Sequence, residues 1–151
     1  MPYLQLDVPA RYSIAAKRAA AKRMGEVYAE VMQTTPDLVH VCFRELDEGG
    51  LWHCSAGEPQ PAAVLMCEVR RGRAPEQRAR LGDALIKICA DAFGLDETQI
   101  SVEFTQHAGD EIYRTVLVDG VLRGGLGKDW TAKETGTPLM AVLAAETAAR
   151  G

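Results

Sequence analysis

Long apolar segments are absent from this chain of 151 residues. No run of side chains approaches the ~20 apolar residues that a membrane-spanning helix requires, and the first residues lack the basic and then apolar order of a signal peptide. The chain also has no excess of basic residues, because its formal net charge is −4. We therefore expect a cytoplasmic protein that has neither a membrane nor a nucleic acid as its partner.

Cysteines and histidines are few and scattered. The four cysteines form no CxxC pair and lie in apolar segments, which predicts free, buried thiols. Only His53, beside Cys54, hints at a pair of metal ligands. We therefore expect no metal and no other cofactor. The ordinary balance of 47% hydrophobic and 25% charged residues predicts one globular domain over residues 1–151.

An internal repeat organises the first two thirds of the chain. Shifting the sequence by 61 positions, which carries residue 4 onto residue 65, aligns two strand–helix–strand segments without a gap. The apolar residues of the two opening strands coincide, Leu4, Leu6 and Val8 with Leu65, Cys67 and Val69. The closing strands match in the same way, Val39, Val41 and Phe43 with Ile100, Val102 and Phe104.

A helical pattern of apolar residues separates the two strands of each segment. In the first segment Ser13 is placed to cap a helix, and Pro36 and Asp37 are expected to end it. In the second segment Pro75 suits the first helical turn and Gly94 suits the C-terminal cap. Each segment therefore predicts two parallel strands that one helix covers.

The predicted fold class is α+β. Residues 2–46 and 62–106 each form a βαβ unit, and together they predict a four-stranded mixed sheet with two helices on one face. The other face of such a sheet needs cover, and a ring of identical subunits, here a homotrimer, is one way to supply it.

Two segments lie outside the repeat. Residues 47–61 are rich in glycine and proline and read as a linker, with a short strand at residues 51–53. Residues 107–151 form a C-terminal extension, in which Asp119 and Gly120 predict the tight turn of a hairpin. An alanine-rich helix over residues 139–149 is expected to follow.

Pro2 directly follows Met1, so removal of the methionine would leave a secondary amine at the start of the chain. A free α-amino group titrates near ~7.7–8.0. Apolar surroundings or a neighbouring cation lower this pKa, so that the neutral amine predominates at working pH. Such an amine can act as a general acid, a general base or a nucleophile.

Arg70 and Arg73 stand between the third strand and the second helix. Two guanidinium groups in this place can hold a carboxylate by paired hydrogen bonds. Their positive potential near Pro2 would keep its amine neutral and stabilise an enolate-like charge on a substrate. The alternative is that both are merely exposed charges between two elements.

A proline that opens the first of two βαβ units resembles the tautomerase superfamily. The run Val69-Arg70-Arg71-Gly72-Arg73, followed by Glu76-Gln77-Arg78, is similar to a strand end and helix start of 4-oxalocrotonate tautomerase. Length and layout most resemble the cis-3-chloroacrylic acid dehalogenase group, whose R-x-G-R pattern Arg70 and Arg73 match. The resemblance implies that the proline moves protons and that both arginines bind a substrate carboxylate.

Three positions depart from the dehalogenase pattern. Tyr28 stands where that group has a histidine, and it also suits an ordinary core aromatic of the first helix. Glu103 replaces a tyrosine and faces either the pocket or a neighbouring subunit. Glu111 matches the water-activating glutamate only if a gap of three residues is allowed.

The leading expectation is a proton-transfer enzyme that acts on a small 2-oxo or enol carboxylic acid. Hydration of a 3-haloacrylate, with Glu111 or Glu103 activating water, is an alternative. Decarboxylation of malonate semialdehyde is another, with Asp37 assisting Pro2, although a turn role suits Asp37 better. A non-catalytic trimeric binding protein is the expectation if Met1 is retained, because Pro2 would then have no titratable nitrogen.

Overall fold

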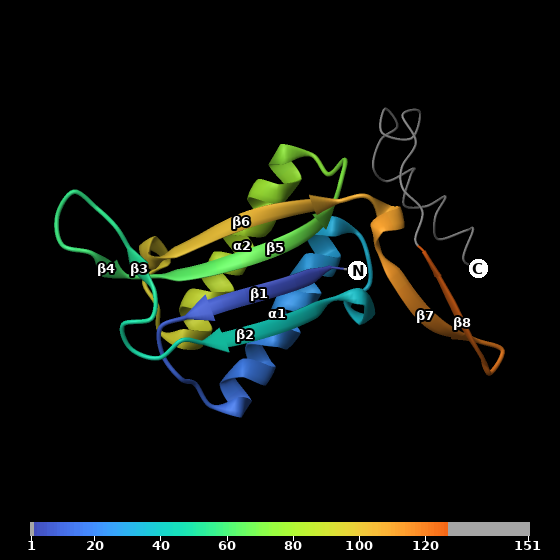
Figure 1. Ribbon diagram of the computed structural model, residues 1–151, viewed down its shortest axis with the longest axis horizontal. Coiled ribbons are helices and arrows are strands. Elements are labelled where there is room, and N and C mark those ends of the chain that lie inside the picture. The colour runs from blue at the N-terminus through green and yellow to red at the C-terminus, as the bar shows by residue number, and fades with distance from the viewer. Residues whose placement is uncertain (1, 127–151) are drawn as a thin grey trace. The chain divides into compact units, whose positions relative to one another are not determined.

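The structure is a computed structural model that describes residues 2–126, so the expected helix over residues 139–149 lies outside the described residues. The chain divides into two compact units. The larger unit contains Met1–Glu68 and Ala74–Thr105, and the smaller unit contains Val69–Arg73 and Gln106–Gly151. Figure 1 labels the elements of both units.

Two strand–helix–strand segments fill most of the larger unit, as the repeat predicts. The first contains β1 (Tyr3–Val8), α1 (Ile14–Met32) and β2 (His40–Glu45). The second contains β5 (Ala63–Arg70), α2 (Pro75–Phe93) and β6 (Ile100–His107). The repeat spacing of 61 carries both ends of α1 onto both ends of α2. It also carries the short 3-10 helix η1 (Pro36–Leu38) onto η2 (Glu97–Gln99).

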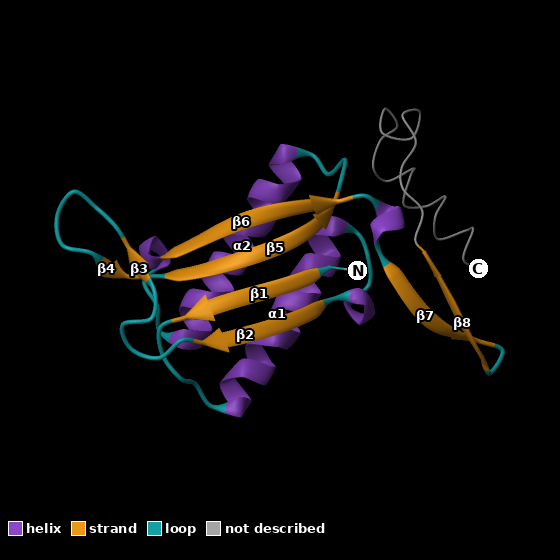
Figure 2. Ribbon diagram, in the orientation of Figure 1, coloured by secondary structure: helices purple, strands orange, loops and turns teal. Residues whose placement is uncertain are grey.

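The four long strands form one mixed sheet in the order β2-β1-β5-β6. β1 runs parallel to β2 and antiparallel to β5. Both helices cover the same face of this sheet (Figure 2). The expected α+β fold is therefore confirmed. Because of these strand directions, β1 and β2 begin at the end of the sheet towards which β5 runs.

The core lies between the sheet and the two helices. Every second residue of β1 and β5 is buried, because alternate side chains of a strand point to opposite faces. Fully buried side chains come from both strands and both helices: Leu4, Leu6, Leu65, Cys67, Met24, Met32, Leu81 and Leu85. Burying each such leucine contributes about 1.5–3 kcal/mol.

The helix ends agree with the sequence at three of four places. The Ser13 side chain accepts a hydrogen bond from the Ala16 amide at 3.1 Å, and Pro75 begins α2. Gly94 ends α2 with a left-handed φ of 62°. The predicted end of α1 at Pro36 is wrong, because the helix ends at Met32, before the left-handed Gln33.

The segments outside the repeat contain two short hairpins. In the linker, β3 (Trp52–His53) pairs with β4 (Gln60–Pro61), which confirms the short strand. In the smaller unit, η3 (Gly109–Glu111) precedes β7 (Tyr113–Val118) and β8 (Val121–Leu126). A two-residue turn joins β7 to β8, and its residues Asp119 and Gly120 both have positive φ, as the sequence predicts.

All four cysteines are free thiols, as expected. Cys67 and Cys89 are buried, and burial raises the pKa of each thiol to about 12. Cys42 is half-buried and Cys54 is exposed, so the expectation of burial is wrong for Cys54. Cys54 is exposed because it follows the short strand β3 in the linker, away from the helix-covered face of the sheet.

Candidate functional site

Pro2 lies immediately before β1, the second strand of the sheet, and is half-buried. Its backbone carbonyl accepts a hydrogen bond at 3.0 Å from the amide of His40, the first residue of β2. Parallel pairing continues this contact, beginning with Tyr3 opposite His40. Pro2 is thus held at the start of β1 by a hydrogen bond from the edge strand β2, so a group on Pro2 would have a defined position.

Tyr3 follows Pro2 on the opposite face of β1, the face that the helices leave uncovered. A side-chain hydrogen bond with Cys42 of β2 and partial desolvation raise the pKa of the Tyr3 phenol, against the opposing charge of Arg44. Tyr3 therefore remains a neutral hydroxyl at neutral pH. Alternation along β1 indicates which face Tyr3 occupies, but its contact with Cys42 depends on the register of two strands.

Tyr28 lies in the core, with only 3% of its surface exposed. Its hydroxyl donates a hydrogen bond at 2.9 Å to the carbonyl oxygen of Glu68. This bond ties α1 to β5 and satisfies a phenol that burial removes from water. Tyr28 thus has the position of a core aromatic.

Asp37 lies in η1, directly before β2, and its side chain is exposed. The backbone amide of Asp37 donates to the Thr35 side chain at 3.4 Å, which is the pattern of a capped turn. Its place in the turn accords with the local structural role that the sequence favours for it.

Arg70 and Arg73 belong to the smaller unit. Arg70 is the last residue of β5 and is half-buried, whereas Arg73 is only 8% exposed and precedes the first turn of α2. Gly72 between them has a φ of 94°, a left-handed conformation that glycine adopts without a steric penalty. Buried arginine is unusual unless its charge is compensated, so the burial of Arg73 argues against a merely exposed surface charge.

Glu111 also belongs to the smaller unit and ends η3. One carboxylate oxygen accepts a hydrogen bond from the Ala108 amide at 2.6 Å and lies 3.8 Å from Nδ1 of His107. The carbonyl of His107 in turn accepts a hydrogen bond from the Arg71 amide at 2.8 Å. The smaller unit therefore joins a carboxylate, an imidazole and the arginine segment. Sequence reasoning missed His107, although its spacing of four residues from Glu111 was a signal.

The six residues predicted for the site are divided between the two units. Arg70, Arg73 and Glu111 belong to the smaller unit, whereas Pro2, Tyr28 and Glu103 belong to the larger unit. Glu103 is exposed on β6. Among residues 2–126, no group of three or more His, Cys, Asp or Glu side chains is placed to hold a metal ion. None of the helices described here is long and apolar enough to cross a membrane.

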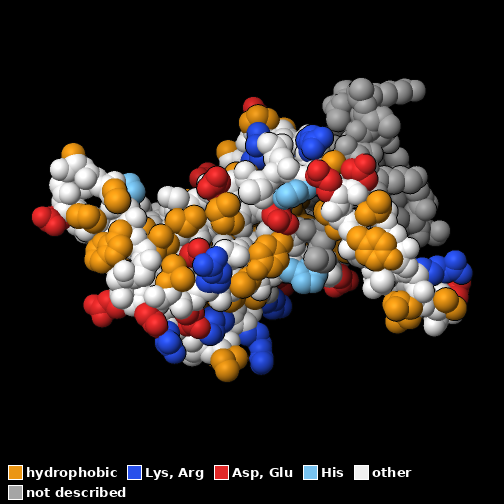
Figure 3. Space-filling model, viewed as in Figure 1, with side chains coloured by type: hydrophobic (Ala, Val, Ile, Leu, Met, Phe, Trp, Pro, Cys, Tyr) orange, Lys and Arg blue, Asp and Glu red, His pale blue; other side chains and the backbone are white. Residues whose placement is uncertain are grey.

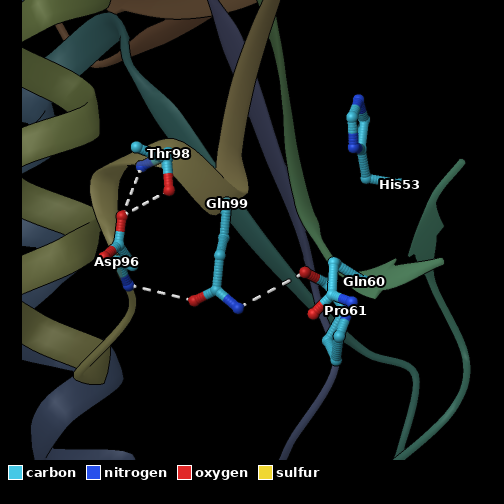
Figure 4. A pocket seen from close by; sticks show the side chains of 6 residues that line it. All are labelled: His53, Gln60, Pro61, Asp96, Thr98 and Gln99. Carbon is cyan, nitrogen blue, oxygen red and sulfur yellow. Dashed lines mark hydrogen bonds between the residues drawn. The ribbon is translucent and has the colours of Figure 1, made fainter. Parts of the chain in front are cut away.

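An open cavity of about 410 Å³ occurs elsewhere in the larger unit. Its lining comes from the β3–β4 hairpin and from the segment around η2, and Figure 4 shows the six residues: His53, Gln60, Pro61, Asp96, Thr98 and Gln99. No residue predicted for the site lines this cavity. Sequence reasoning missed it because its residues come from two segments with no shared motif.

Solved structures share the fold of this chain. The Q0 fused 4-OT wild type symmetric trimer is 18% identical with a TM-score of 0.65, over 89% of this chain and 99% of that chain. Macrophage migration inhibitory factor of Toxoplasma gondii is 17% identical with a TM-score of 0.64, over 73% and 93%. Pt0534 inactivated by 2-oxo-3-pentynoate is 22% identical with a TM-score of 0.63, over 73% and 89%.

No protein-family model matches the chain, and no curated protein matches it in sequence. At identities below a quarter, the structural likeness establishes the fold alone. The chain therefore has the β-α-β fold of 4-OT and macrophage migration inhibitory factor structures, which agrees with the fold that the resemblance to the tautomerase superfamily implies.

Proposed function

We propose that this chain is a tautomerase-like enzyme in which the amine of Pro2 moves a proton on a small 2-oxo or enol carboxylic acid. The observation that carries the proposal is the fixed, half-buried position of Pro2 before β1, with its carbonyl bound to the His40 amide. The fold shared with 4-OT structures supports it. The proposal requires removal of Met1, because Pro2 in a peptide bond has no titratable nitrogen.

The proposed reaction is a proton transfer with no net oxidation. The neutral Pro2 amine takes the proton of the enol hydroxyl, and the electron pair of that O–H bond forms the carbonyl. The carbon–carbon double bond shifts its electrons to carbon, which receives the proton from the Pro2 ammonium group. The amine is thereby regenerated, and a positioned proton carrier of this kind contributes about 10²–10⁴-fold to a rate.

Arg70 and Arg73 are proposed to bind the substrate carboxylate. Both residues belong to one short segment of the smaller unit, and two guanidinium groups in one segment can hold a carboxylate by paired hydrogen bonds. Arg73 is held by burial, so its planar guanidinium group loses little further freedom when it binds a carboxylate. Loss of Arg73 is therefore expected to raise KM more than it lowers kcat.

The substrate class has independent support from a protein of the same fold. Pt0534 was inactivated by 2-oxo-3-pentynoate, which is itself a 2-oxo acid. If Pro2 has a free amine here, the same reagent should attach to it, in addition to any reaction with the exposed thiol of Cys54. Intact-mass measurement followed by peptide mapping would find the adduct on Pro2, with Pro2→Ala as the control. A mass that includes Met1 in the purified protein would exclude amine catalysis.

A pH–rate profile tests the proton transfer directly. Ketonisation of phenylenolpyruvate is measured for the wild type, Pro2→Ala and Arg73→Ala. We expect Pro2→Ala to lose about 10²-fold or more in kcat, and the wild-type profile to show an essential base with a pKa below that of a free α-amino group, ~7.7–8.0. Unchanged rates in both variants would refute the assignment of both residues.

A homotrimer is proposed as the assembly. The helix-free face of the sheet carries half-buried apolar side chains, among them Met66 and Val64 of β5, and Figure 3 shows apolar side chains along this face. The fused 4-OT structures are trimers, which supports the same stoichiometry. Light scattering during size-exclusion chromatography would return three times the chain mass of 16.4 kDa if the proposal is right.

Hydration of a 3-haloacrylate is the second candidate function. The observation that favours it is the hydrogen-bonded Glu111 beside His107, in the unit that also holds Arg70 and Arg73. A carboxylate next to an imidazole can take a proton from water. Release of chloride from cis-3-chloroacrylate by the wild type, and its loss in Glu111→Gln, would support this function over tautomerisation alone.

A further inference from the structure

The cavity at the β3–β4 hairpin lies at the end of the sheet opposite to Pro2. It is lined by Pro61, two residues before β5 begins, whereas Pro2 precedes β1, which runs antiparallel to β5. The six residues of β1, at ~3.3 Å each, separate the two places by roughly 20 Å. Figure 1 shows the hairpin and the chain start at opposite ends of the strands. The cavity is therefore distinct from the proposed site at Pro2.

The internal repeat relates the two places. The spacing of 61 carries Pro2 onto Ala63. It also carries Thr35 and Asp37, which precede β2, onto Asp96 and Thr98, which precede β6. The cavity thus occupies, in the second repeat, the position that Pro2 and its neighbours occupy in the first. Ala63, the equivalent of Pro2 in the second repeat, has an ordinary amide nitrogen and cannot carry amine chemistry. The side chains that line the cavity therefore suit ligand binding.

The cavity presents uncommitted oxygen atoms. The Gln99 side chain spans the wall, because its oxygen accepts from the Asp96 amide at 3.0 Å and its nitrogen donates to the Pro61 carbonyl at 3.4 Å (Figure 4). The Thr98 hydroxyl donates to Oδ1 of Asp96 at 2.5 Å, and the Gln60 nitrogen donates to a linker carbonyl. Oδ2 of Asp96 and Oε1 of Gln60 accept no hydrogen bond from the residues that the structure describes.

Asp96 gives the cavity a negative charge. Hydrogen bonds from the Thr98 side chain and the Thr98 amide hold the pKa of the Asp96 carboxyl below its ordinary value, so it is ionised at neutral pH. No lysine or arginine is among the six lining residues. A ligand with a positive charge and N–H donors would meet the carboxylate of Asp96. The volume of about 410 Å³ falls within the ~300–1,000 Å³ range of small-molecule sites.

We propose that this cavity binds a small organic cation through a guanidinium or primary ammonium group, with Asp96 as the charged partner. The first repeat has no such site, because Thr35 and Leu38 stand where Asp96 and Gln99 stand in the second. The binding does not involve the Pro2 amine. It can therefore fail or succeed independently of the proposed enzymatic function.

Butylguanidine and butylurea form a matched pair of probes, because urea has a similar planar shape without the charge. Titration of the isotope-labelled full chain, followed by the amide resonances of Thr98 and Gln99, measures binding at the cavity itself. We expect saturable shifts with butylguanidine and binding of butylurea at least about tenfold weaker, since a hydrogen bond to a charged group is stronger than a neutral one. Equal binding of the two probes would overturn the proposal.

Asp96→Asn separates charge from structure. Asparagine is as good an N-cap as aspartate, so the turn that Asp96 caps should persist while the charge is lost. We expect butylguanidine to bind Asp96→Asn about tenfold more weakly and Asp83→Asn, an exposed change on α2, as tightly as wild type. Undiminished binding to Asp96→Asn would contradict the proposal. If Asp96→Asn fails to fold, the two probes on wild-type protein still decide.

Two further arms complete the experiment. A peptide with one arginine, acetyl-Gly-Arg-Gly-amide, tests whether the cation can come from a protein side chain. Binding of butylguanidine without binding of the peptide would identify a free small molecule as the source. Pro2→Ala is expected to bind butylguanidine normally. Loss of binding in Pro2→Ala, together with absent shifts at Thr98 and Gln99, would place the cation at Pro2 and refute the second site.

Discussion

In the two strand–helix–strand segments of the larger unit, the helices begin and end at equivalent residues, 61 positions apart. The segments differ in the side chains that cap these helices and in their charged residues. Leu4 and Leu65 occupy equivalent positions, and both are fully buried. Ser13 caps α1 with its side chain, whereas the equivalent Ala74 makes no such bond. Buried positions are therefore constrained by packing, whereas caps and surface charges are free to differ.

The buried leucines of the two segments should be equally sensitive to truncation. Leu4→Ala and Leu65→Ala each remove a side chain with 0% exposure. Each is expected to lower the free energy of unfolding by about 2–5 kcal/mol, from lost burial and the cavity left behind. Urea unfolding followed by circular dichroism measures both. A loss of unfolding free energy below about 1 kcal/mol for either variant would show that the two leucines do not contribute equally to the core.

The two helix ends differ in the residue that adopts the left-handed conformation. Gln33 ends α1 with a φ of 53°, and Gly94 ends α2 with a φ of 62°. A Cβ atom at residue 94 would meet no atom within 4 Å, so backbone strain should dominate the cost of Gly94→Gln, about 1 kcal/mol. Gln33→Gly should stabilise the protein by a similar amount. Thermal unfolding of both variants would contradict this if the two shifts had the same sign.

The two helix starts allow a reciprocal exchange of smaller size. Ala74 has φ −62° and ψ 145°, close to the φ −64° and ψ 152° of Ser13, so a serine at residue 74 has the right backbone for a cap. Ser13→Ala is expected to cost about 1 kcal/mol, and Ala74→Ser to gain about half of that. Urea midpoints of the two variants and of the double variant measure both effects. Destabilisation by Ala74→Ser would show that its cap cannot form.

Much of this fold could be predicted because apolar spacing and turn residues determine it. The alternation of Leu4, Leu6 and Val8 is what burial of one strand face requires, and Asp119 with Gly120 suits a two-residue hairpin turn. The end of α1 was not predictable in the same way. Residue type does not indicate that Gln33 would take the left-handed conformation, and a proline further along was a misleading stop signal.

The candidate site was less predictable because its contacts join separate elements. The position of Pro2 at a strand start followed from the sequence, but its bond to His40 and the contact of Tyr3 with Cys42 depend on how β1 and β2 pair. The Glu111–His107 pair depends on the turn of η3. Residue patterns indicate which face a side chain occupies, whereas its partner across the sheet requires the register.

The closing strands of the two segments differ in charge, and this difference should appear as acid sensitivity. Glu45 of β2 lies 2.6 Å from the Lys17 ammonium group and accepts a hydrogen bond from the Tyr12 amide at 2.7 Å, whereas the equivalent residue of β6 is the neutral Gln106. The Lys17 hydrogen bond, followed by the Tyr12 amide, holds the pKa of the Glu45 carboxyl below its ordinary value of 4.5.

A carboxyl whose pKa is lower in the folded than in the unfolded protein stabilises the fold above the unfolded pKa. That contribution is lost as the pH falls through the folded pKa. Glu45→Gln should therefore lower stability slightly at neutral pH and flatten its loss from about pH 4.5 downwards. Glu30→Gln, an exposed change on α1, is the control. Urea midpoints between neutral pH and about pH 3 measure the stability of both variants. If the stability of Glu45→Gln falls with acid as steeply as that of the wild type, other carboxylates cause the acid sensitivity.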